Sequence, residues 1–132
     1  MAYEIPGFKL TLAAGETLTT HQYYFAKISA DNTVVMATDL TDIPVGIIQN
    51  TAANGGAVEL MVSGVSKLIV GAGGAISAGQ LVGCDADGKG IVVDPDGAND
   101  YYYVGQAISG GAAGEIISVL INCATPVIQS GS

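Results

Sequence analysis

Hydrophobic positions recur along the chain with a period close to two, not with the 3.6-residue period of a helix. Residues 8–12 alternate between apolar and polar side chains, and residues 58–62 do so in part. Residues 45–48 and 116–121 are nearly continuous apolar runs. Alternation is typical of a strand with one face in a core, and a short continuous run is typical of a strand covered on both faces. Since no window combines a helical stripe with two caps, the pattern predicts strands.

Turn-forming residues separate these predicted strands at regular intervals. They are rich in Gly, Asn and Asp, and they lie at 14–15, 31–32, 54–56, 71–74, 87–88, 95–97 and 110–111. Regularly spaced short strands with such turns favour a sandwich or barrel over alternating strands and helices. We therefore expect an all-β fold, built as a small single-domain β-barrel or sandwich.

The two halves of the chain resemble each other. Four segments match: 30–35 with 86–92, 45–46 with 104–105, 56–59 with 114–117 and, more weakly, 18–22 with 76–80. A nearly constant offset of 56 to 59 residues between separate segments indicates an internal repeat. We predict two similar β units, at 14–70 and 73–123, which pack on each other because two copies are too few for a solenoid.

The two ends of the chain differ from the repeat. Residues 1–8 have no match within it, and the Pro-Gly pair at 6–7 interrupts any strand there, so we expect a flexible N-terminal arm. The last residues are small and polar, which predicts a flexible tail at 126–132. Between these ends, residues 9–125 form the predicted single β domain.

Apolar side chains in the arm and in a run of three tyrosines are the candidate partner-binding residues. In an extended arm Tyr3 and Ile5 share one face, and Phe8 follows the Pro-Gly break. Such a segment is suited to add a strand to the edge of a partner's sheet. Tyr102 faces away from its two tyrosine neighbours on a strand, so one side of that strand carries a bulky ring suited to an interface. The alternatives are a frayed terminus without a role and tyrosines that cover the chain's own core.

Composition restricts the classes of partner. Hydrophobic residues make up 49% of the 132 residues, enough for a buried core, while the formal net charge is −8. The four cationic residues are lysines far apart in the sequence, so we expect no nucleic-acid binding and no docking on an anionic membrane. No apolar run reaches the roughly 18 residues of a membrane span. The N-terminus lacks a signal-peptide pattern, so we expect synthesis in a cytoplasm.

One short segment resembles a calcium-binding loop. Asp85, Gly90 and Asp96 match positions one, six and twelve of such a loop. Lys89 occupies position five, where an oxygen ligand is required, and the flanking residues predict strands instead of helices. We therefore expect a tight turn around residues 87–88 and no metal site.

Other reactive side chains are few. His21 is the single histidine and lies among Thr and Gln residues, which argues against a catalytic triad and against zinc. We expect Cys84 and Cys123 to be small buried thiols, because a cytoplasm is reducing; a disulfide is the alternative. The sequence predicts no enzyme, no catalytic residue and no cofactor.

The order of several motifs resembles the head decoration (capsid cement) proteins of tailed bacteriophages. These motifs are Val-Ser-Gly-Val-Ser-Lys at 62–67, Gly-Ala-Ile-Ser-Ala-Gly-Gln-Leu-Val at 74–82, Asp-Ala-Asp-Gly-Lys at 85–89, Val-Gly-Gln-Ala at 104–107 and Gly-Glu-Ile-Ile-Ser-Val-Leu at 114–120. The resemblance covers most of the chain, from about residue 15 to residue 121. Each motif is generic, and their order and spacing carry the similarity.

This resemblance implies a structural protein of the virion, synthesised in the host cytoplasm. Its partner would be the major capsid protein, and it would bind the capsid exterior as a homotrimer and stabilise the head. A β module that binds a carbohydrate or host surface is the alternative, and an exposed aromatic platform in a concave site would favour it. A small hydrolase is a remote third reading, which would require His21 beside a carboxylate and a nucleophile.

Overall fold

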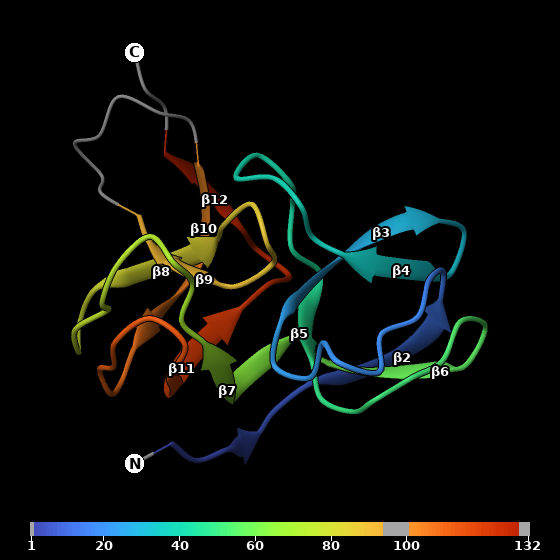
Figure 1. Ribbon diagram of the computed structural model, residues 1–132, viewed down its shortest axis with the longest axis horizontal. Helices are drawn as coiled ribbons and strands as arrows, with labels where there is room; N and C mark the ends of the chain where they lie inside the picture. Colours follow the sequence, from blue (N-terminus) through green and yellow to red (C-terminus); the bar gives the residue numbers. More distant parts are fainter. Residues whose placement is uncertain (1, 94–100, 130–132) are drawn as a thin grey trace.

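Twelve strands make up the regular structure of residues 2–93 and 101–129, the part of the chain that this computed structural model describes (Figure 1). The strands are β1 (Ile5–Pro6), β2 (Lys9–Ala14), β3 (Phe25–Ala30), β4 (Thr33–Met36), β5 (Gly46–Ile48), β6 (Ala57–Met61), β7 (Ser63–Ile69), β8 (Leu81–Cys84), β9 (Gly90–Val92), β10 (Tyr101–Ala107), β11 (Ile116–Asn122) and β12 (Val127–Gln129). Within these described residues no helix could cross a membrane. The predicted all-β fold is confirmed.

Strands β2 to β6 close into a barrel with the order β2-β4-β3-β5-β6, here called the N-terminal barrel. Its β2 pairs antiparallel with β6 and parallel with β4, where Ala14 lies opposite Val34. Leu18, Ile48 and Leu60 are fully buried in its interior. The alternation predicted over residues 8–12 is the observed alternation of more and less exposed side chains along β2.

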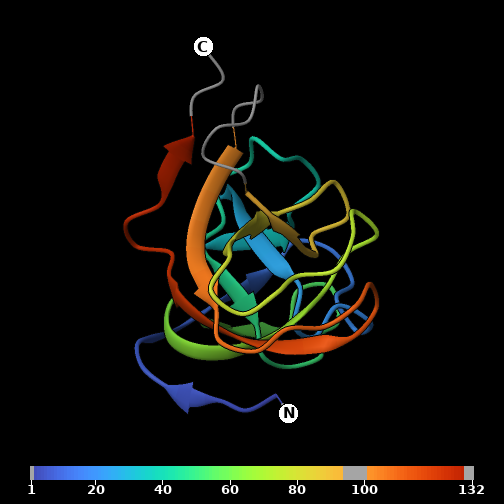
Figure 2. The ribbon, with the colours of Figure 1, turned by 90° about the vertical axis from the view of Figure 1, so that its left-hand side faces the viewer.

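Strands β7 to β11 form a second sheet, here called the curled sheet, with the order β7-β11-β10-β8-β9. It curls until its ends meet, because Val70 just after β7 forms a parallel bridge with Gly90 of β9. The two chain ends extend this sheet: β1 pairs with β7, and β12 pairs with β10. Figure 2 shows the N-terminal residues passing beneath β7 and β11.

The internal repeat is present in the pattern of hydrogen bonds. In the N-terminal barrel the amide of Gly15 donates to the carbonyl of Val34, and 56 residues later that of Gly71 donates to Gly90. The bond from Gln49 to Glu59 recurs 59 residues later between Ile108 and Ser118. Strands β2 to β6 thus correspond in pairing to β7 to β11, and the prediction of two similar β units is confirmed.

The boundary between the units differs from the predicted one. The units begin with β2 at residue 9 and β7 at residue 63, so β7 opens the second unit instead of closing a first unit at 14–70. The Gly-rich turn at 71–74, which spans the predicted boundary between the units, lies within the second unit, because Gly71 corresponds to Gly15 and Ile76 to Leu18 in their backbone hydrogen bonds. The real link is Val62 alone, a residue without any turn signal.

A shared core joins the two units. Phe25, Ile47 and Met61 of the N-terminal barrel pack in one cluster with Leu68 and Val82 of the curled sheet. All five side chains are fully buried. The N-terminal barrel and the curled sheet are therefore parts of a single domain and not independent modules.

Backbone hydrogen bonds also cross the junction between the barrel and the curled sheet. The Phe25 amide donates to the carbonyl of Gly88 at 2.7 Å, and the Ile69 amide donates to that of Tyr23 at 3.2 Å. These bonds fix how the two units are oriented on each other, because backbone groups have little freedom to move once their strands are paired.

Both predicted flexible ends contain strands. Residues 127–129 of the predicted tail form β12, in which Val127 lies opposite Tyr103 and Ile128 opposite Tyr102. Residues 5–6 of the predicted arm form β1 against β7. The arm, which has no matching segment in the repeat, thus pairs within the chain, because the edge of β7 offers free backbone groups that the arm satisfies.

Candidate partner-binding surface

The N-terminal arm lies in a site built by β7 and β11. In β1, Ile5 lies opposite Val65 and Pro6 opposite Gly64. Two residues nearer the N-terminus, the amide of Tyr3 donates a hydrogen bond to the Ser118 hydroxyl at 2.6 Å, and this hydroxyl donates to the carbonyl of Tyr3 at 3.2 Å. Ser118 is fully buried although its side chain points away from the core. The arm therefore covers the only hydroxyl in β11.

Glycines allow the arm to approach β7 this closely. Gly64 has φ of 120°, and a Cβ atom there would lie 2.7 Å from the Gly7 nitrogen and 2.9 Å from the Ile5 carbonyl oxygen. A Cβ atom on Gly7 would in turn overlap the carbonyl of Ser63. We call Ser63, Gly64, Val65 and Ser118 the arm seat. Its shape is specific for a strand with glycine at this point.

An apolar row runs across the sheet beside the arm. Ile5, Val65 and Leu120 are direct cross-strand partners on β1, β7 and β11, so their side chains share one face. Ile5 is 58% exposed and Leu120 is 51% exposed. Gln106 of β10 continues the row, since it pairs with Leu120. Large aliphatic side chains this exposed on one face are typical of an interaction surface.

A groove of about 410 Å³ adjoins the row at Leu120. Tyr103 and Gln106 of β10, Leu120 of β11 and Val127 of β12 are among its lining residues. Val127 is 46% exposed, and its cross-strand partner Tyr103 is half-buried. We call Tyr3, Ile5, Leu120, Tyr103 and Val127 the apolar face. It combines exposed aliphatic side chains with an adjoining groove, a surface that a partner's side chains could fill.

The structure brings together only some of the predicted partner-binding residues. Tyr3, 42% exposed, and Ile5 lie on the apolar face. Phe8 is 59% exposed but lies beyond the Pro-Gly break, where its carbonyl accepts a hydrogen bond from Val62. Tyr102 is half-buried against Ile128, three strands away from β1.

The prediction from sequence did not include Leu120 or Val127. A signal for Leu120 was present in the continuous apolar run at 116–121. Only one face of such a strand packs against the core, so the apolar side chains of the other face must be covered by another segment or a partner. Val127 had no such signal, since residues 126–132 were taken for a tail.

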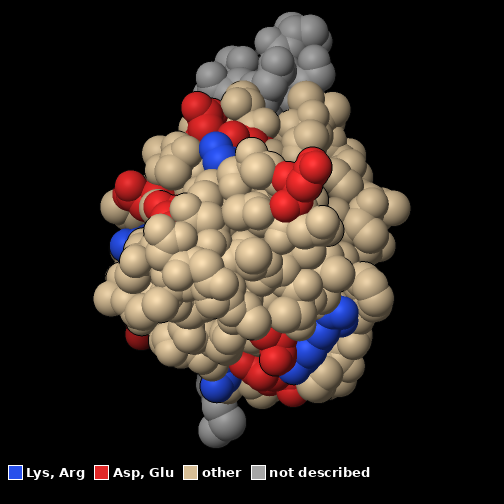
Figure 3. Space-filling model, turned by 90° about the vertical axis from the view of Figure 1, so that its right-hand side faces the viewer, with Lys and Arg blue, Asp and Glu red and all other residues tan. Residues whose placement is uncertain are grey.

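The charged groups are dispersed around the molecule. Figure 3, which views the N-terminal barrel, shows acidic groups and lysines around the margin of a broad uncharged area. Lys9 pairs with Glu59 at 2.8 Å and Lys27 with Asp42 at 2.9 Å. Lys67 and Lys89 lie over tyrosine rings, each 5.6 Å from the ring centre. The lysines thus have separate local roles instead of forming a cationic patch.

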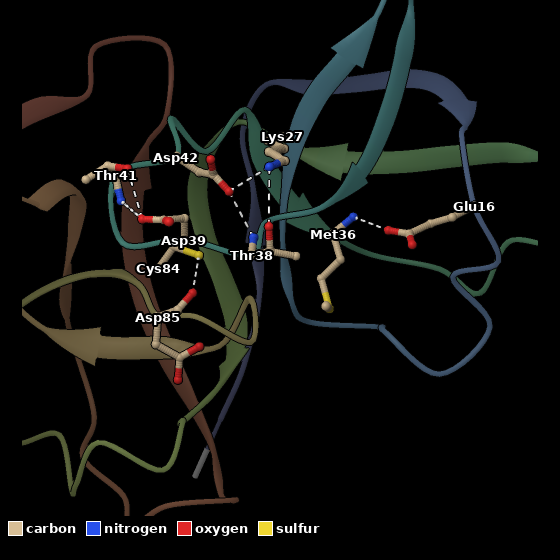
Figure 4. Close-up of polar contacts among 9 residues, drawn as sticks. All are labelled: Glu16, Lys27, Met36, Thr38, Asp39, Thr41, Asp42, Cys84 and Asp85. Carbon is tan, nitrogen blue, oxygen red and sulfur yellow. Dashed lines mark hydrogen bonds and ion pairs between the residues drawn. The ribbon is translucent and has the colours of Figure 1, made fainter.

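A polar loop beside β3 contains the less exposed of these two ion pairs, that of Lys27 and Asp42 (Figure 4). The Asp42 carboxylate accepts hydrogen bonds from Lys27 and from the Thr38 amide, both at 2.9 Å. Partial burial favours a higher pKa for Asp42, but these two hydrogen bonds outweigh it and lower the pKa. The amide and hydroxyl of Thr41 lower the pKa of Asp39 in the same way. These contacts organise the loop.

The segment that resembles a calcium loop forms the expected tight turn. The Gly88 amide donates to the Asp85 carbonyl at 3.2 Å. The Asp85 carboxylate accepts hydrogen bonds from the amides of Asp87 and Lys89, at 2.8 and 2.9 Å. This carboxylate therefore stabilises the turn. Asp96, the twelfth position, lies outside the described residues.

The histidine and the cysteines have ordinary structural surroundings. The His21 ring packs edge-on against Tyr24, with centroids 5.0 Å apart, and its Nδ1 lies 3.4 Å from the Thr20 hydroxyl. Cys84 and Cys123 are buried free thiols, as expected. Burial raises the pKa of each to about 12, and the nearby Asp85 contributes at Cys84. Both thiols stay protonated at neutral pH and are poor nucleophiles.

Comparison with known proteins gives one family and one fold. The model of a family described as phage cement protein matches residues 10–122. Among solved structures, the chain is similar to the head fiber gp8.5 N base of bacteriophage phi29, with a TM-score of 0.62 and 16% identity over 88% of this chain and 94% of that chain. At this identity the likeness establishes the fold alone. A search of curated proteins found no match.

Proposed function

Because the chain belongs to the phage cement protein family, we propose that it binds the exterior of a bacteriophage capsid and stabilises the head. The family is structural, and its members are associated with the virion. The similar fold of a protein described as part of a phage head fiber supports a place on the outside of the head.

The partner in this proposal is the major capsid protein, bound through the apolar face. The observation that carries it is the row of Ile5 and Leu120, which are more than half exposed on one sheet face beside an apolar groove. Such side chains contribute binding energy when a partner removes them from water, at roughly 25 cal/mol per Å². Phe8 and Tyr102 are secondary contacts in this proposal, because each lies outside that face.

The working unit in this proposal is a homotrimer. Capsid proteins surround local three-fold positions, and a trimer presents three copies of one surface there at once. Simultaneous contacts raise the apparent affinity because the second and third contacts form within one complex. The alternative function, a carbohydrate-binding module, would require an exposed aromatic platform. Tyr103 is the aromatic residue that lines the groove of about 410 Å³, and its ring is half-buried, which does not favour this alternative.

Reconstitution on particles that lack the protein tests this proposal. Purified protein is added to such heads, bound protein is measured by co-sedimentation, and cryo-microscopy locates it on the shell. We expect saturable binding and a higher temperature of DNA release from decorated heads. Absence of binding, or binding to the isolated host surface instead, would overturn the proposal.

A pair of matched variants tests the surface. Ile5→Asp places a charge on the apolar face, and Ile28→Asp places one on the N-terminal barrel at a side chain that is also 58% exposed. We expect Ile5→Asp to weaken binding to heads at least tenfold and Ile28→Asp to leave it within twofold. Equal effects of the two variants would show that the capsid contact lies elsewhere.

A further inference from the structure

The contacts that hold the arm do not depend on which copy of the chain supplies it. The arm seat recognises the arm through two backbone-paired residues, the close approach of Gly7 to Gly64, and the hydroxyl of Ser118. All of these contacts lie between the arm and the curled sheet. An arm that reached the seat from a neighbouring copy would make the same contacts, which is the condition for exchange of an element between protomers.

The arm also leaves its own unit to reach the seat. Gly7 and Phe8 are the only residues between β1, which lies on the curled sheet, and β2, which belongs to the N-terminal barrel. A change of direction at this hinge redirects the whole arm. Release breaks the pairing of β1 with β7 and the two hydrogen bonds between Tyr3 and Ser118, and an arm seated in a neighbouring copy regains both. The contacts that depend on the direction of the hinge itself are the hydrogen bonds of the Phe8 carbonyl with the Val62 and Ser63 amides.

The exposure of Phe8 favours an arm that occupies the seat of a neighbouring copy over an arm that occupies the seat of its own chain. At 59%, Phe8 is the most exposed large hydrophobic side chain in the described part of the chain. In the closed arrangement it contacts water for no structural benefit. If an arm passed from one copy to the next, the hinge would lie at the boundary between the copies, where the neighbour would be placed to cover the Phe8 ring.

We propose that in the assembled protein the arm of each copy occupies the arm seat of the next copy, which closes the trimer as a ring of exchanged strands. This inference rests on the trimer in the proposed function. A head-to-tail contact of this kind closes when the rotation between copies returns to the first one, and every seat is then filled once. Tyr3 and Ile5 stay on the apolar face in this arrangement, so a capsid contact there includes side chains from two copies.

Disulfide trapping between two differently labelled chains tests the exchange. One full-length chain carries Ile5→Cys and the other Val65→Cys, at positions that are direct cross-strand partners. The chains are mixed, unfolded, refolded and oxidised, and the products are separated without reductant. Exchange predicts a covalent dimer that contains one chain of each kind. If each arm stays in its own seat, the two cysteines lie in different molecules and no such dimer forms, which overturns the inference.

Two controls make the result unambiguous. A single chain with Val65→Cys and Leu120→Cys carries both cysteines on neighbouring strands of one sheet, so it forms a disulfide within the chain in either arrangement. The native thiols stay reduced because burial raises their pKa to about 12. Mixed dimers from a protein that does not bind heads would support the exchange and contradict the proposed cement function. Binding to heads without mixed dimers would support the cement function and overturn the exchange.

Discussion

Tyr23 and Gly79 occupy equivalent turns of the two units, 56 residues apart, and both have positive φ, 71° and 91° respectively. The amide of each donates to the last residue of a corresponding strand, Ile48 in one unit and Ala107 in the other. Glycine adopts this conformation freely, whereas a tyrosine is strained there. Tyr23 also receives the junction bond from Ile69, so its strained backbone helps to hold the units together.

Gly79→Ala tests the cost of this conformation. No atom lies within 4 Å of a Cβ at this position, so the substitution adds backbone strain without a clash. We expect the free energy of unfolding to fall by about 1 kcal/mol. Chemical denaturation measures the change, with Ala78→Ser in the same exposed turn as the control, which should leave the midpoint nearly unchanged. An unchanged denaturation midpoint in Gly79→Ala would show that the turn relaxes to another conformation.

Ser118→Ala tests the contact between the arm and β11. The hydroxyl makes two hydrogen bonds to the backbone of Tyr3, and its loss leaves the amide and carbonyl of that residue without partners. We expect a loss of about 1–2 kcal/mol in the full chain. In a chain that lacks residues 2–6 the same substitution should change stability by less than about 0.5 kcal/mol, because the partner is gone. Equal losses in both chains would mean that the arm does not occupy the seat.

The ion pair of Lys27 and Asp42 predicts a pH dependence. The pKa of Asp42 is lower in the folded chain than in the unfolded chain, so its contribution is complete above the unfolded value of 3.8 and is lost as the pH falls through the lower folded value. We expect Asp42→Asn to lower stability by about 1 kcal/mol at pH 6. The difference from the unmodified chain should shrink below pH 3.8. A difference that is constant from pH 6 to pH 2 would contradict a charge-dependent contact.

The buried thiols predict slow alkylation of the folded chain. Burial raises the pKa of Cys84 and Cys123 to about 12, so at pH 8 the reactive thiolate is a fraction on the order of 10⁻⁴ of each group, before any effect of limited access. Mass spectrometry after treatment with iodoacetamide should find both thiols unmodified in the native protein and both modified in denaturant. Rapid modification of either thiol in the native chain would show that its site opens readily.

The local pattern of the sequence was sufficient for the strands, the tight turns and the repeat. Alternation along residues 8–12 and the turn at Asp85 to Gly88 depend on neighbours within a few residues, so they can be predicted without the rest of the fold. The repeat was visible because several equivalent segments keep similar residues at a nearly constant offset, although others, such as the turns at Tyr23 and Gly79, do not. Its boundary was misplaced, because Val62 changes sheets without any turn residue to mark it.

The candidate surface was decided by contacts between residues far apart in the sequence. Ile5 reaches the face of Leu120 because β1 pairs with β7 and β7 pairs with β11, a register that no single segment contains. The same pairing buries Ser118 under the arm, 115 residues away, while Leu120 two residues further on stays exposed. Side-chain direction follows from the strand alone, but exposure depends on which other segment covers that face, and only the tertiary structure determines this.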